Sequence, residues 1–124
     1  ENFPARLREV LGERFIVTYG LDNCLFVYSM EEWALLADKL QKLPISKANK
    51  LKRFFFACAA EVEPDKQGRI LIPSHLRKYA GLVQEITIAG VSNHAEIWDS
   101  GRWAEMNEEL TAESIAEAMD ELGF

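Results

Sequence analysis

The residues best suited to binding chemistry gather in one segment, Pro64-Asp65-Lys66-Gln67-Gly68-Arg69, near the middle of the chain. The guanidinium of Arg69 could grip a phosphate or bind a guanine edge through two hydrogen bonds. Lys66 suits a phosphate, and the amide of Gln67 could read a base. The competing interpretation of Arg69 is an ion pair with Asp65 that braces the segment. Both roles can hold together.

The same segment has the composition of a tight loop between two strands. Gly68 tolerates a positive φ, and the carboxylate of Asp65 can accept hydrogen bonds from amides two or three residues on. Strands are predicted at Glu61-Val62-Glu63 and Ile70-Leu71-Ile72. A short helix should follow from Pro73 to Gly81, with Ser74 as a candidate cap. The unit is therefore strand, cationic loop, strand and helix.

An enzyme is not expected from the inventory of side chains. His75 and His94 have no carboxylate or thiol at motif spacing, so neither a metal site nor a nucleophile pair is indicated. A single glycine, Gly68, does not make a phosphate-cradling loop. Cys24 and Cys58 lie in apolar contexts and are predicted to be reduced, buried thiols. We expect no cofactor, no metal and no small-molecule substrate.

The chain repeats itself at an offset of 69 to 70 residues. Pro4-Ala5-Arg6-Leu7-Arg8 aligns with Pro73-Ser74-His75-Leu76-Arg77, and the match continues through glycine, asparagine and tryptophan positions as far as Trp33 and Trp103. Rare residue types at a nearly constant spacing indicate two copies of one module. The helix arginines and lysine (Arg6, Arg8, Arg77 and Lys78) are expected to lie away from the loop tip.

These motifs resemble the MraZ family. The resemblance rests on the Asp-x-x-Gly-Arg-x-x-x-Pro pattern from Asp65 to Pro73, on the segment Gly20 to Tyr28 and on the run Arg53-Phe54-Phe55-Phe56-Ala57. It implies an α+β fold of two tandem AbrB-like, swapped-hairpin barrel modules that form one pseudo-symmetric domain, with linker and C-terminal helices. Members are bacterial transcriptional regulators that form rings and bind short direct repeats upstream of the division and cell-wall gene cluster.

We divide the chain into a first module at residues 1–43, a linker helix at 44–59, a second module at 60–103 and acidic C-terminal helices at 104–124. The family's first module also opens with an Asp-x-x-Gly-Arg loop, whereas only Glu1-Asn2-Phe3 precede Pro4 here. We expect that the sequence is truncated at this end. If the loop has been lost instead, the chain could assemble without binding DNA.

The net charge of −6 is distributed unevenly. Residues 104–124 carry seven acids and no Lys or Arg, whereas residues 42–78 carry nine bases against three acids. Because salt screens exposed charges beyond about 8 Å, the local balance sets the field at a surface. The acidic total therefore does not exclude DNA binding. Four linker cations are either a solvated helix face or secondary DNA contacts: Lys47, Lys50, Lys52 and Arg53.

The remaining elements are predicted from periodicity and caps. Three consecutive phenylalanines, Phe54 to Phe56, should lie in the core or at a subunit contact. Ser46 is a candidate cap of the linker helix. Thr111 is a candidate cap of the last helix, but the capping box is incomplete in the sequence, because Ser114 stands where Glu or Gln is usual. The expected elements are a helix at 4–11, strands at 15–19 and 25–28, a helix at 31–43 capped by Ser29 and Glu32, strands at 86–88 and 96–98, and helices at 103–110 and 111–122.

The resemblance and the charge pattern together predict a cytoplasmic, nucleoid-associated transcriptional repressor that binds double-stranded DNA as a cyclic homo-oligomer, with no membrane partner. Its DNA contacts would come from Asp65, Lys66, Gln67 and Arg69. One loop with two or three cations binds weakly, so several loops must act together. The alternative is an antitoxin-like module that binds a protein through its acidic C-terminal helix.

Overall fold

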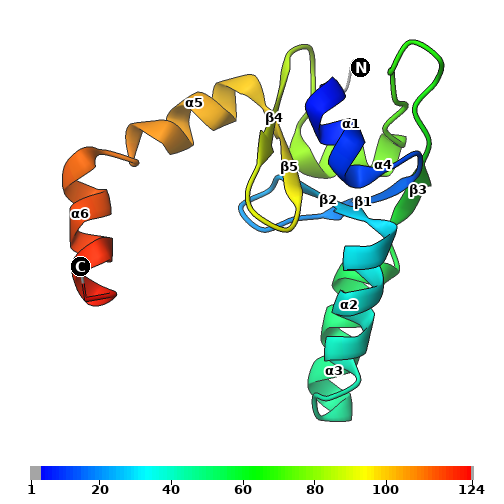
Figure 1. Ribbon diagram of the computed structural model, residues 1–124, viewed down its shortest axis with the longest axis horizontal. Coiled ribbons are helices and arrows are strands. Elements are labelled where there is room, and N and C mark those ends of the chain that lie inside the picture. The colour runs from blue at the N-terminus through cyan, green and yellow to red at the C-terminus, as the bar shows by residue number, and fades with distance from the viewer. Residues whose placement is uncertain (1–3, 124) are drawn as a thin grey trace.

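The computed structural model describes residues 4–123, so the first three residues of the predicted first module and the last of the acidic segment lie outside it. A five-stranded antiparallel sheet with the order β3-β1-β2-β5-β4 forms its centre, and helices lie on both sides (Figure 1). The sheet is not closed. The strands are β1 (Phe15–Tyr19), β2 (Leu25–Ser29), β3 (Ala60–Val62), β4 (Ile86–Gly90) and β5 (Ala95–Asp99).

The helices alternate with these strands in both halves of the chain. The predicted α+β class is therefore confirmed, and the chain contains two copies of a helix, hairpin and helix unit. None of the helices in residues 4–123 is long and apolar enough to cross a membrane. The helices are α1 (Ala5–Leu11), α2 (Met30–Leu40), α3 (Ile45–Leu51), a π-helical turn η1 (Lys52–Phe56), α4 (Ser74–Ala80), α5 (Ser100–Glu108) and α6 (Ala112–Glu121).

The two repeats meet at the centre of the sheet. Phe26 of β2 pairs with Glu96 of β5, and these two residues are separated by the repeat offset. On either side of this central pair, Leu25 pairs with Ile97 and Val27 pairs with Ala95. The repeat offset relates these two flanking pairs to each other, because Ala95 is the equivalent of Leu25 and Ile97 is the equivalent of Val27. A pseudo-twofold axis passes between Phe26 and Glu96, as expected for duplicated halves of one domain.

The hairpin turns of the two repeats differ by one residue. Tyr19 pairs with Leu25, whereas Gly90 pairs with Ala95, the repeat equivalent of Leu25. Gly90 therefore occupies the place of Tyr19 rather than that of Gly20.

The second repeat reaches across into the first. β3 pairs with β1, so that Phe15 lies opposite Val62. In addition, the hydroxyl of Tyr79 on α4 donates a hydrogen bond to the carbonyl of Gly20 at 2.7 Å, and its ring stacks on Tyr19 with centroids 4.0 Å apart. The two halves thus share strands and helices, as the swapped arrangement implied by the resemblance requires.

Side chains alternate between the two faces of the sheet because successive residues of a strand point to opposite sides. On one face a large core joins the sheet to α1 and α4, with Phe15, Val17, Leu25 and Ile97 fully buried. On the other face a smaller cluster is built on Phe26 and Trp98. The sheet therefore carries packed side chains on both faces.

The linker packs as part of the chain's own core. Phe54 contacts Tyr19, Phe55 stacks on Phe26, and Phe56 stacks on Trp33 of α2 with centroids 4.3 Å apart. The hydroxyl of the fully buried Thr18 hydrogen-bonds the carbonyl of Phe55. These contacts support the core interpretation of the phenylalanines, and the predicted subunit contact stays a prediction.

Capping predictions were confirmed at Ser29 and Thr111 and wrong at Ser46 and Ser74. The hydroxyl of Ser29 accepts from the amide of Glu32, and the carboxylate of Asp99 accepts from Arg102. Ser46, in contrast, lies inside α3, which begins after Pro44 without a side-chain cap. Ser74 is the first residue of α4, which begins after Pro73 without a side-chain cap. Thr111 and Ser114 form a complete reciprocal capping box. The hydroxyl of Ser114 accepts a hydrogen bond from the amide of Thr111, as the side chain of Glu or Gln usually does at this position.

Two further expectations were wrong in detail. Ile70 to Ile72 form no strand; Arg69 alone makes an isolated β-bridge, and the three residues after it run as extended coil to Pro73. Ile70 and Ile72 are buried while Leu71 is exposed, so this apolar run alternates in burial although it forms no strand. Cys24 is fully buried as predicted, but Cys58 is only partly so.

Candidate nucleic-acid interface

The loop from Asp65 to Arg69 is closed by its own backbone. The amide of Asp65 donates to the carbonyl of Arg69 at 2.8 Å, and the amide of Gly68 donates to the carbonyl of Asp65 at 2.9 Å. Gly68 has φ +80, a value that side-chain-bearing residues rarely adopt. The loop therefore has a defined conformation that depends on a glycine at this position.

The carboxylate of Asp65 organises the loop from inside. One oxygen accepts from the amides of Gln67 and Arg69, each at 2.9 Å, and the other accepts from Nε of Arg69 at 3.1 Å. The amide of Arg69 is the main cause of a pKa of Asp65 below its ordinary value, and Gln67 and the arginine side chain lower it further. Asp65 thus braces the loop, and its predicted contact with DNA stays a prediction.

The side chains that could meet DNA are exposed on this braced loop. Lys66, Gln67 and Arg69 are all exposed, and the side chain of Arg69 keeps 57% of its surface despite the ion pair. The pair uses only Nε, which leaves the two terminal nitrogens of the guanidinium without a partner in the described part of the chain. Bracing and binding are therefore compatible roles for Arg69.

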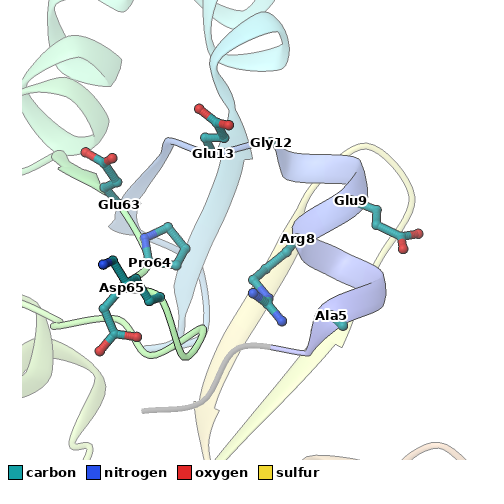
Figure 2. A pocket seen from close by; sticks show the side chains of 9 residues that line it. Ala5, Arg8, Glu9, Gly12, Glu13, Glu63, Pro64 and Asp65 are labelled. Carbon is teal, nitrogen blue, oxygen red and sulfur yellow. The ribbon is translucent and has the colours of Figure 1, made fainter.

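Arg8 lies against the loop, contrary to the expectation that the helix cations lie away from it. Figure 2 shows its side chain leaving α1 on the side that faces Pro64 and Asp65, while Glu9 points elsewhere. The Cζ of Arg8 is so near that a Cβ added at Gly68 would lie 2.8 Å from it. Sequence reasoning missed this contact because it joins the helix of one repeat to the loop of the other.

A groove of about 640 Å³ separates α1 from the loop (Figure 2). Four carboxylates and two cations line it, so its walls are polar and of mixed charge. These side chains are Glu9, Glu13, Glu63, Asp65, Arg8 and Lys66.

The four linker cations are exposed on α3 and η1, as expected for either interpretation of them. In Figure 1, α3 and the loop after β3 lie at opposite ends of the view, with the sheet between them. Lys47, Lys50, Lys52 and Arg53 therefore do not extend the loop surface within one subunit, and their role as secondary DNA contacts stays a prediction.

Neither histidine has the surroundings of a catalytic base. Nε2 of His75 is 2.8 Å from the carbonyl of Cys58. His94 packs on Phe26 and Tyr28, and burial lowers its pKa. Within residues 4–123, no group of His, Cys, Asp and Glu side chains could hold a metal ion.

The chain matches one protein family along almost its whole length. That family is described as "MraZ protein, putative antitoxin-like", and the match covers residues 2–53 and 55–122.

Curated relatives agree with this match. A protein of Acetivibrio thermocellus named transcriptional regulator MraZ is 56% identical over 125 residues, which covers 98% of this chain and 87% of the relative. Proteins of the same name from Caldicellulosiruptor bescii and Clostridium beijerinckii are 53% and 49% identical, with the same coverage. These relatives are named as regulators and not as enzymes, which confirms the expectation drawn from the side-chain inventory.

Proposed function

The chain belongs to the MraZ family of transcriptional regulators, and from that premise we propose that it binds promoter DNA through the loop from Asp65 to Arg69. The observation that carries the proposal is the guanidinium of Arg69, which is exposed and held in place by the carboxylate of Asp65. A side chain fixed in advance loses less conformational freedom on binding. Arg69 reads a guanine edge or grips a phosphate, and Lys66 and Gln67 contact the backbone and a base beside it.

Binding by one loop is weak, and this favours a cyclic homo-oligomer. A loop with two cations neutralises few phosphates, so its affinity falls steeply with salt. Copies of the loop around a ring would meet short direct repeats along one duplex, and linked contacts raise the overall affinity by orders of magnitude without any new contact. The ring would act in the cytoplasm at the nucleoid and, by covering promoter repeats of the division and cell-wall cluster, as a repressor.

Replacing Arg69 with alanine is expected to lower the affinity for promoter DNA by about 1–3 kcal/mol per loop, because a hydrogen-bonded cation is lost from the interface. The measurement is the dissociation constant across a salt series, on a duplex selected from a random-sequence library by the unaltered chain. Arg14→Ala is the matched control, since it removes an exposed arginine that lies outside both the loop and the linker cations. A loss below about threefold for Arg69→Ala, with an unchanged salt slope, would leave the proposal without its main residue.

The second candidate function is protein binding through the C-terminal helices. It is favoured by α6, which projects away from the sheet (Figure 1) and exposes Ile115, Met119 and Leu122 beside an acidic surface. The two functions are distinguished by what copurifies with the chain. Nucleic acid favours DNA binding, whereas a stoichiometric protein partner that is lost on deletion of residues 111–124 favours the second function.

A further inference from the structure

Gly68 is covered by a side chain from the other repeat. It is buried, although Asp65, Lys66, Gln67 and Arg69 around it are all exposed. A Cβ at this position would lie 2.8, 2.9 and 3.1 Å from Cζ, Nη1 and Nη2 of Arg8. Since three atoms of one guanidinium are at nearly equal distances from that point, the planar group of Arg8 lies across the backbone of the loop.

The contact involves a guanidinium that is partly removed from water. Nε of Arg8 is buried and has no hydrogen-bond partner in the described part of the chain. Burying an unpaired donor is unfavourable, so the packing of the plane on Gly68 must offset that loss. A lysine could not do the same, because its ammonium is a compact, strongly hydrated charge without a flat face.

α1 and the loop are both attached to the core of the sheet. α1 is joined to the sheet core through Leu11, and the loop is joined to the same core through Val62 before it and through Ile70 and Ile72 after it. The loop is therefore anchored in the core at both ends, and between these ends Arg8 contacts its inner side at Gly68. Asp65 sets the shape of the loop, and Arg8 sets where that shape sits relative to the sheet.

We propose that Arg8 is a positioning residue, whose guanidinium fixes the loop of the second repeat at Gly68 so that Arg69 is presented to DNA. The effect of Arg8 on DNA binding rests on the proposed function. The effect of Arg8 on the loop is independent of any ligand. Arg8 acts through Gly68 and the loop backbone and does not itself neutralise a phosphate.

The test compares Arg8→Lys with Arg6→Lys, a matched change on an exposed arginine of the same helix. The first readout is hydrogen exchange of the Gln67 and Arg69 amides in the free protein, both of which donate to Asp65. Exchange should accelerate by about five- to tenfold in Arg8→Lys and stay unchanged in Arg6→Lys, because losing the planar contact releases the loop. The melting temperatures of the two variants should agree.

The second readout is affinity for the selected duplex across salt. Arg8→Lys should weaken binding by about five- to tenfold, with the salt slope of the unaltered chain, because the charge is kept and no phosphate contact is lost. Arg8→Gln should weaken binding similarly, again without a change in slope. The positioning role is overturned if Arg8→Lys exchanges and binds like Arg6→Lys. It is also overturned if Arg8→Gln lowers the slope by about one while loop exchange is unchanged, since Arg8 would then be a phosphate contact.

The same experiment separates this inference from the proposed function. If the unaltered chain ignores the duplex at low salt, DNA binding fails. The exchange rates of Gln67 and Arg69 alone then decide whether Arg8 holds the loop.

Discussion

Replacing Phe15 with alanine is expected to lower the free energy of unfolding by about 3–5 kcal/mol. Phe15 is fully buried in the larger core, where β1 lies between β2 and β3. Truncation removes a large apolar side chain from β1, the strand of the first repeat that pairs with β3. The sheet cannot collapse to fill the space without moving β3. Urea denaturation followed by circular dichroism measures the change.

The control for this variant is Leu71→Ala. Leu71 is 84% exposed, so its truncation should change the free energy of unfolding by no more than about 0.5 kcal/mol. Equal losses in the two variants would contradict the assignment of the core. A loss below about 1 kcal/mol for Phe15→Ala would do so as well.

Replacing Gly68 with alanine is expected to weaken DNA binding by about 5- to 30-fold per loop. The backbone at φ +80 disfavours a side chain by about 1–2 kcal/mol, and the new Cβ would press on the guanidinium of Arg8. The loop should therefore leave the conformation in which Asp65 holds Arg69. Because the change lies in an exposed loop, the affinity should fall much more than the stability does.

Gly81 supplies the matched control for this effect. It ends α4 at φ +64, and a Cβ added there meets nothing within 4 Å. Gly81→Ala should have a similar backbone strain but leave DNA affinity within about twofold of the unaltered chain. Equal affinity losses in both variants would indicate that the fold, and not the loop, had been damaged.

Much of the fold could be predicted from the sequence because the signals were local. β1 and β2 follow from apolar strand residues around a Gly and Asn turn, and β1 has the bounds predicted for it. The repeat predicted two equivalent halves, and the pairing of Phe26 with Glu96 joins them about a pseudo-twofold axis. The ion pair between Asp65 and Arg69, which was the competing interpretation of Arg69, is present as well.

The rest depended on contacts between distant segments. Nothing in the residues around Arg8 indicates that it meets Gly68, because the contact exists only after the two repeats interlock. The apolar run from Ile70 to Ile72 predicted a strand, but the burial of Ile70 and Ile72 in the core does not require regular strand geometry. The π-helical turn at η1 was hidden for a similar reason: it places the carbonyl of Phe55 beside Thr18 of β1.

The central claim is that the loop from Asp65 to Arg69 is the DNA-binding surface. It is tested most directly by titrating the full chain with the selected duplex while the backbone amide resonances are followed. The account predicts that the resonances of Lys66, Gln67, Gly68 and Arg69 shift most and that those of α6 stay in place. Shifts confined to α3, or a duplex that leaves the loop resonances unmoved while it binds, would contradict it.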